Sequence, residues 1–139
     1  GGIMGSRRKA REAAVQMLYQ MDSCGLNAAD TIRLFWQHLG VAAEQDAFAD
    51  QLVQGCAQVQ DEIDAKIRSV SRHWRLERMS RVDRNIIRLA AYELMHVPEI
   101  PRRVTLNEAV ELAKRFGNEE SPAFVNGVLD RIADEVGKA

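Results

Sequence analysis

Residues 98–130 read PEIPRRVTLNEAVELAKRFGNEESPAFVNGVLD, and this stretch decides the fold class because it predicts two amphipathic helices joined by a tight link. Thr105 and Glu108 have the T-x-x-E spacing of a capping box, which predicts a helix from 105 to 116 that ends at Gly117. Ser121 and Pro122 then restart the chain as the N-cap and first residue of a helix over 121–136. Apolar residues follow helical spacing along both helices, in two stripes: Leu106, Ala109, Val110, Ala113 and Phe116, then Val125, Val128, Leu129, Ile132 and Val136.

The rest of the chain shows the same helical spacing of apolar residues. Further helices are expected over these ranges: 7–23, 27 or 30 to 39, 44–59, 62–70 and 80–97. Ser6 is a candidate cap of the first, Gly40 ends the second, and Ser80 with Asp83 predicts a second capping box. Residues 71–79 form a polar joint that contains Trp74. The pattern predicts an all-α protein of about seven helices.

Length and composition indicate one domain. The chain has 139 residues, of which 46% are hydrophobic, and no apolar run is long enough to cross a membrane. We expect residues 1–6 to be a vector remnant or a disordered arm and 7–139 to form the domain. Cys24 and Cys56 are isolated from each other and from any metal-binding pattern, so we expect reduced thiols in a cytoplasmic protein.

Two polar positions within apolar stripes are predicted to be architectural. Glu93 falls on the apolar side of the helix over 80–97, so it is expected to be a buried carboxylate that is paired or hydrogen-bonded. Gly127 lies inside the last helix, where glycine costs about 1 kcal/mol relative to alanine, and the expected return is close approach of another helix.

The first helix carries the best candidate for a binding surface. Its core stripe places Tyr19 on the opposite side, together with Arg8 and Val15. An aromatic ring and cations on one free face suit single-stranded nucleic acid, because cations meet phosphates and the ring stacks on a base. The alternative is that Tyr19 packs against another helix and the arginines are a solvated helix start.

No pattern of catalysis is found. The sequence has no phosphate-binding glycine loop, no zinc-protease motif and no nucleophile elbow, and its three histidines are scattered. We therefore expect a protein that is not an enzyme and holds no metal or cofactor.

Three blocks of the sequence closely resemble the NusB family of bacterial transcription antitermination factors. These blocks are RRKAREAAVQMLYQMD at 7–22, RVDRNIIRLAAYEL at 81–94, and LNEAVELAKRFG with FVNGVLD at 106–130. Residues 27–72 match only as generic amphipathic helix. The resemblance implies two packed three-helix bundles. It also implies a factor that binds boxA-like RNA together with the ribosomal protein NusE and assembles an antitermination complex on RNA polymerase, chiefly for ribosomal RNA operons.

The resemblance also implies site residues. The RNA-binding positions are Arg7, Arg8, Lys9, Arg11, Tyr19 and Phe124. The acidic positions expected to contact NusE are Glu77, Asp83 and Glu120. Two alternatives stay open, since Phe124 lies at the edge of a core stripe and Asp83 could simply cap its helix with Ser80.

The chain departs from the family pattern in a basic run, which comprises Arg72, Arg75, Arg78, Arg81 and Arg84. Either the RNA path extends over it or it is solvated. Two rival functions also remain: the NusB-like RNA-binding module of a ribosomal RNA cytosine methyltransferase, and a homodimeric helical interaction protein that works without RNA.

Overall fold

The computed structural model describes the backbone of residues 3–39 and 45–139 and, within these ranges, the side chains from Ser6 onward. This part of the chain contains seven α-helices, one short 3₁₀ helix and no strand. The helices are α1 (Ile3–Cys24), α2 (Ala28–Leu39), α3 (Ala47–Gln58), α4 (Gln60–Val70), α5 (Arg81–His96), α6 (Arg102–Phe116) and α7 (Ser121–Glu135), with the 3₁₀ helix η1 (Leu76–Arg78) between α4 and α5.

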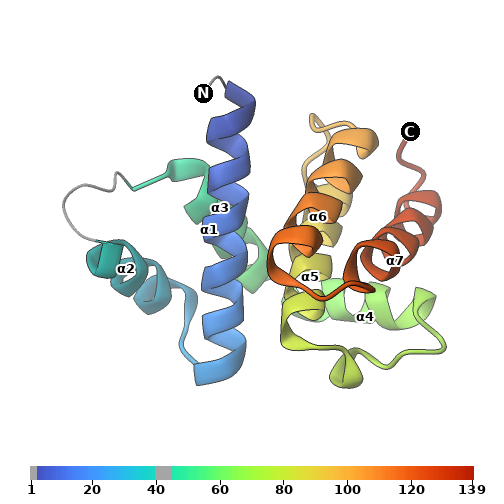
Figure 1. Cartoon of the computed structure of the whole chain (residues 1–139), viewed down its shortest axis with the longest axis horizontal. Helices are drawn as coiled ribbons and strands as arrows, with labels where there is room; N and C mark the ends of the chain where they lie inside the picture. Colours follow the sequence, from blue (N-terminus) through green and yellow to red (C-terminus); the bar gives the residue numbers. More distant parts are fainter. Residues whose placement is uncertain (1–2, 40–44) are drawn as a thin grey trace.

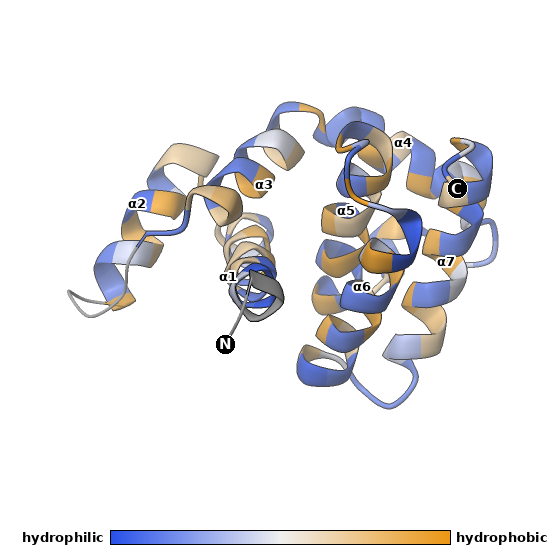
Figure 2. Ribbon diagram, turned by 90° about the horizontal axis from the view of Figure 1, so that it is seen from above, coloured by the Kyte–Doolittle hydropathy of each residue, from blue (hydrophilic) through white to orange (hydrophobic). Residues whose placement is uncertain are grey.

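The helices form two bundles (Figure 1). Helices α1, α2 and α3 contact one another, and so do α5, α6 and α7. Helix α4 packs against α5 and α7, and α1 packs against α5, which joins the bundles. Seen from above in Figure 2, α1–α3 lie on one side and α5–α7 on the other. The predicted two-bundle, all-α architecture is confirmed.

Helix α5 is the centre of the core. Ile86, Ile87, Leu89, Ala91 and Leu94 on this helix are all at most 4% exposed. Burying an isoleucine or leucine side chain contributes about 1.5–3 kcal/mol. A helix that is apolar nearly all round is stable only when covered on several sides, and α5 is covered by α1, α3, α4, α6 and α7.

Several predicted helix ends were wrong. Helix α1 begins at Ile3, so Ser6 lies inside it and is not its cap. Helix α3 begins at Ala47, where Asp46 Oδ1 accepts hydrogen bonds from the amides of Phe48 and Ala49 at 2.9 and 3.1 Å. The predicted boundaries at Gly40 and Glu44 lie outside the described residues.

The capping box at Thr105 was also wrong. Helix α6 begins three residues earlier, at Arg102, so both Thr105 and Glu108 lie within the helix and are buried. Their side chains bind other helices, as described below. At the start of α7, Ser121 is the first helical residue rather than the cap, and Asn118 Oδ1 accepts from its amide at 3.1 Å. The Ser80 cap is confirmed, because Ser80 Oγ accepts from the Asp83 amide at 3.1 Å.

The close approach between helices occurs at a different glycine from the one predicted. A Cβ at Gly127 would meet nothing within 4 Å. A Cβ at Gly55 on α3 would overlap the hydroxyl of Tyr92 on α5. Gly55 therefore lets α3 and α5 approach, and the prediction for Gly127 was wrong.

Candidate nucleic-acid interface

Helix α1 is fixed to the second bundle by a buried charge network near its N-terminal end. Arg11 donates to Glu93 on α5 from Nε at 2.8 Å and from Nη2 at 3.0 Å. Thr105 on α6 donates to the same carboxylate at 3.0 Å. Arg11 is 4% exposed and Glu93 1%. The prediction for Glu93 is confirmed, whereas the prediction that Arg11 belongs to an RNA-binding surface was wrong, because its guanidinium is used inside the protein.

A second network holds the C-terminal end of α1. Asp22 Oδ2 accepts from Arg84 Nε and Nη2 at 2.9 and 2.7 Å and from Asn85 Nδ2 at 2.9 Å. Arg88 donates to Asp64 on α4 at 2.8 and 3.0 Å. Burial alone would raise the pKa of Asp22, but the hydrogen bonds from Asn85 and Arg84 outweigh it and hold the pKa below its usual value. Together the two networks set the rotation of α1 about its axis.

That rotation leaves Tyr19 on the surface. Its side chain is 40% exposed, as the position opposite the core stripe predicted. Val15, which was predicted to share this free face, is only 3% exposed, so that part of the prediction was wrong. Val15 forms the floor of a groove rather than a surface contact.

The groove beside Tyr19 has a volume of about 850 Å³ and lies between α1, α2, the start of α5 and the end of α6. Among the described residues its lining contains no Lys, Arg, Asp or Glu, and consists of Val15, Gln16, Tyr19, Gln20, Leu34, Phe35, Gln37, His38, Leu39, Val82 and Phe116. Aromatic rings and side-chain amides are groups that stack on bases and hydrogen-bond to their edges. The groove thus offers contacts for bases, while its described lining supplies no Lys or Arg for phosphates.

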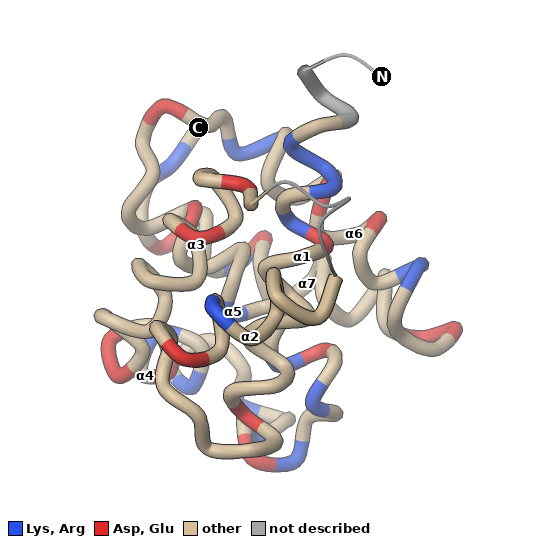
Figure 3. Tube along the Cα trace, turned by 90° about the vertical axis from the view of Figure 1, so that its left-hand side faces the viewer, with Lys and Arg blue, Asp and Glu red and all other residues tan. Residues whose placement is uncertain are grey.

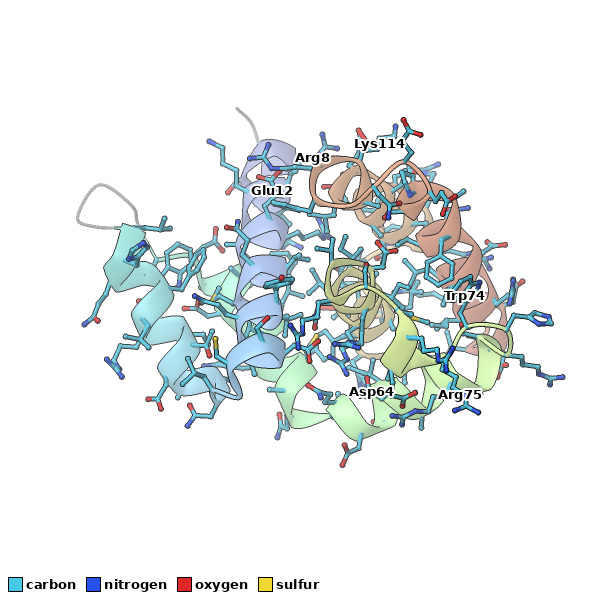
Figure 4. The ribbon with its side chains drawn as sticks, turned by 60° about the horizontal axis from the view of Figure 1, so that its bottom comes forward. Arg8, Glu12, Asp64, Trp74, Arg75 and Lys114 are labelled. Atoms are coloured by element: carbon cyan, nitrogen blue, oxygen red, sulfur yellow. The ribbon has the colours of Figure 1, made fainter. Side chains whose placement is uncertain are left out.

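Cations suited to bind phosphates lie on the same helix, nearer its N-terminal end. Arg7, Arg8 and Lys9 are exposed on the N-terminal half of α1, where Figure 3 shows a cluster of Lys and Arg positions. The Arg7 guanidinium lies 4.2 Å from the centre of the Phe48 ring. Arg8 donates to Glu108 at 3.2 and 2.7 Å while its side chain stays 47% exposed, and it lies between α1 and α6 in Figure 4. One edge of its fork is therefore occupied.

Phe124 lies elsewhere, at the start of α7. It is half-buried, and its ring packs edge-on against Trp74 with 6.3 Å between the ring centres. Trp74 itself is 56% exposed, and is the most exposed of the large hydrophobic side chains that the structure describes. The partial burial that was left open as an alternative for Phe124 is present, and the exposed aromatic ring here is that of Trp74.

The three acids predicted to contact NusE are in different environments. The Glu77 side chain is 61% exposed and accepts from Arg68 at 2.8 and 3.2 Å. A hydrogen bond from its own backbone amide, followed by Arg68, lowers the pKa of Glu77. Glu120 is exposed at the start of α7. Asp83 is 8% exposed, and its Oδ1 has no hydrogen-bond partner among the described residues, so it does not form part of an exposed acidic surface.

Sequence reasoning missed two parts of this surface. The groove combines residues of four helices, and the stripes of single helices carry no signal of it. Trp74 did carry a signal, since tryptophan is largely buried on average and here it stands among charged residues.

Within the described residues no group of His, Cys, Asp or Glu is arranged to hold a metal ion. None of the described helices is long and apolar enough to cross a membrane. Cys24 and Cys56 are both free thiols, the first exposed and the second buried.

The fold and this surface define an all-helical binding protein of two bundles with an aromatic and basic face on its first helix. A model of the NusB family matches residues 8–134, and the chain belongs to that family. The transcription antitermination protein NusB of Sorangium cellulosum is 53% identical over 135 residues, which is 97% of this chain and 96% of that protein. The NusB of Myxococcus xanthus is 48% identical over 139 residues, 97% of this chain and 99% of that protein.

Solved structures agree in fold. The structure of T. maritima NusB aligns with a TM-score of 0.81 and 38% identity, covering 93% of this chain and 91% of that one. A structure of the antitermination factors NusB and NusE in complex with double-stranded RNA aligns with a TM-score of 0.84 and 29% identity, covering 96% of this chain and 99% of that one.

Proposed function

We propose that this protein is a transcription antitermination factor that binds boxA-like single-stranded RNA together with NusE. It helps to assemble an antitermination complex on RNA polymerase, chiefly on ribosomal RNA operons. It acts in the cytoplasm by binding alone, without catalysis, through the domain formed by residues 7–139. The names of its relatives and the NusB–NusE–RNA structure support this proposal.

The observation that carries the proposal is the exposed Tyr19 ring on the same helix as three exposed cations. Eleven residues separate Arg8 from Tyr19, which is about 16 Å along a helix. The cations bind phosphates, the ring stacks on a base, and the uncharged groove behind it accepts base edges. Arg11 contributes indirectly, because its pair with Glu93 sets which side of α1 faces outward.

The NusE contact is proposed for the exposed acids Glu77 and Glu120. Acids are the complement of a basic ribosomal protein, and opposite charges across an interface speed association and exclude wrong partners. Asp83 is left out of this contact because it is buried.

The test is a titration of labelled boxA-like RNA by fluorescence anisotropy, with and without NusE, beside a scrambled RNA. We expect tighter binding to the boxA-like RNA and a further gain with NusE. Stacking of one base is worth about 1–3 kcal/mol, so Tyr19→Ala should weaken binding about fivefold or more without lowering the melting temperature. Leu26→Ala is the matched control, since Leu26 is 37% exposed and lies outside the groove.

Salt dependence gives a second readout. Each phosphate contact to a single strand contributes a slope of about −0.7, so three cations predict a slope of roughly −2 in log K against log salt. A slope near zero removes Arg7, Arg8 and Lys9 from the site. Equal, weak binding to both RNAs that NusE does not improve contradicts the proposed function and leaves only the family and fold.

A further inference from the structure

The joint between α4 and α5 gathers positive charge that nothing in the described structure neutralises. Three arginines lie in the joint and a fourth is the first residue of α5. All four are exposed, and their side chains make no ion pair among the described residues. They are Arg72, Arg75, Arg78 and Arg81. By contrast, the next two arginines along the chain, Arg84 and Arg88, are bound to Asp22 and Asp64. The basic run therefore has an outer part and an inner part, and only the outer part faces solvent.

Three acids near this outer part are occupied, whereas Asp83, two residues from Arg81, is buried and its Oδ1 has no hydrogen-bond partner among the described residues. Glu77 is paired with Arg68 at 2.8 Å. Asp134 and Glu135, which line a hollow together with Arg72 and His73, are paired with Arg102 and Lys66 at 2.8 and 3.3 Å. The four exposed arginines repel one another, and a polyanion would relieve that repulsion.

An exposed aromatic ring lies among these cations in the sequence. Trp74 is 56% exposed, and Figure 4 shows it with Arg75 on the joint, at the end of the molecule away from α2. The Phe124 ring packs against the Trp74 ring in a T-shaped arrangement, with an angle of 76° between the two ring planes. Exposed guanidinium groups and an open indole on one segment are a combination that binds single-stranded nucleic acid, through phosphate contacts and base stacking.

The joint is held in place although it is not helical over most of its length. Ser71 Oγ donates to the Trp74 carbonyl at 2.8 Å, and Arg131 Nη1 donates to the Val70 carbonyl at 3.0 Å. Leu76 and Met79 are 2% and 6% exposed, so they anchor the segment after Trp74 in the core. A surface that is already ordered loses little entropy when a strand binds to it.

The Arg81 end of the joint lies beside the groove of Tyr19. Figure 1 shows the C-terminal end of α1, the link between α6 and α7, and the joint at the same end of the molecule. The groove of Tyr19 includes Val82, which directly follows Arg81, and Phe116 at the end of α6. A strand that leaves the groove past Val82 meets Arg81 first and then the other cations.

We propose that the outer joint, formed by Arg72, Trp74, Arg75, Arg78 and Arg81, is a second contact surface for the same single-stranded RNA, with Trp74 as its stacking platform. This inference rests on the proposed RNA-binding function and extends it. The arginines of the outer joint favour the RNA as their ligand, whereas the Glu77 carboxylate on the same segment is the group proposed above for NusE, so the two ligands meet at this joint.

The test uses two labelled single-stranded RNAs with the same boxA-like core, one ending at the core and one extended at both ends by unstructured uridines. The wild-type protein should bind the extended RNA more tightly. Trp74→Ala should weaken the extended complex about fivefold or more and leave the short complex unchanged. The triple variant Arg72→Gln, Arg75→Gln, Arg78→Gln should reduce the salt slope for the extended RNA by about 2.

Arg103→Gln is the matched control, because Arg103 is exposed on α6 and makes no ion pair or side-chain hydrogen bond among the described residues. Quenching of tryptophan emission gives a direct readout of stacking. Of the two tryptophans only Trp74 is exposed, since Trp36 is half-buried and donates to Asp50 at 2.8 Å. Thermal melting of each variant checks that it is folded.

Each outcome decides the proposal. Loss of the length advantage in both variants, with unchanged melting and an unchanged control, supports it. If wild type binds RNA and the variants keep the length advantage, the second surface is wrong while the proposed function stands. If the variants keep RNA binding but lose a protein partner such as NusE, the joint is a protein contact. If wild type binds neither RNA, the proposed function fails and takes this extension with it.

Discussion

Two sets of arginines in this molecule have opposite environments. Arg11, Arg84 and Arg88 lie inside, each bound to a carboxylate of another helix. Arg72, Arg75, Arg78 and Arg81 lie outside with no such partner among the described residues. The inner set joins the two bundles, and the outer set is available to a ligand.

Charge counts alone therefore do not locate a binding surface, because a buried ion pair and an exposed cation look the same in the sequence. A guanidinium can be buried when a carboxylate takes its planar fork, as Glu93 takes that of Arg11. Substitutions in the inner set should therefore change the free energy of unfolding, and substitutions in the outer set should change the affinity for RNA. Three further predictions test this division.

The largest effect on stability is expected at the Arg11–Glu93 pair. Glu93→Gln leaves the buried Arg11 guanidinium with Glu108 at 3.8 Å as its remaining counter-charge, and breaking a buried pair costs about 3–5 kcal/mol. Chemical denaturation measures it. The double variant Arg11→Met, Glu93→Leu should recover most of the loss, because a buried pair and a well-packed apolar pair are close in free energy. Equal losses in the single and double variants would contradict a pairing role.

A smaller effect is expected at Asp22. Its pKa in the folded protein lies below the ordinary value of 3.8, so its ionised form stabilises the fold above that pH, and the stabilisation is lost as the pH falls through the folded pKa. Asp22→Asn should cost about 1.5–3 kcal/mol at neutral pH, the usual range for hydrogen bonds to a charged group.

The same variant should flatten the dependence of stability on pH below about 4. The measurement is urea denaturation at a series of pH values. Asp61→Asn, at an exposed position on α4, is the control that should leave the curve unchanged. A wild-type slope that persists in Asp22→Asn would place the acid sensitivity in another carboxylate.

The smallest effect on stability is expected at Arg8, which stands between the two sets. Its pair with Glu108 is half-exposed, so Arg8→Gln should change the free energy of unfolding by less than about 1 kcal/mol. The salt slope of RNA binding should nevertheless fall by about 0.7, for one lost phosphate contact. If stability falls as far as in Glu93→Gln, then Arg8 belongs to the inner set.

The sequence by itself determined the helices, the family and the position of Tyr19. The helices and the position of Tyr19 follow from periodic burial, which each helix shows in its own sequence, and the family follows from the resemblance of three sequence blocks. It also predicted that Glu93 would be buried and bonded, because a carboxylate on an apolar stripe must be paired or hydrogen-bonded or else take up a proton.

Only the tertiary structure decided which arginines are available. Arg11 follows Lys9 by two residues and Arg84 follows Arg81 by three, yet Arg11 and Arg84 are each bound to a carboxylate of a distant segment. The capping box at Thr105 failed for the same reason, since Thr105 and Glu108 bind Glu93 and Arg8 rather than the ends of their own helix. Partners that lie far apart in the chain leave no local pattern, because their pairing depends on how the helices pack.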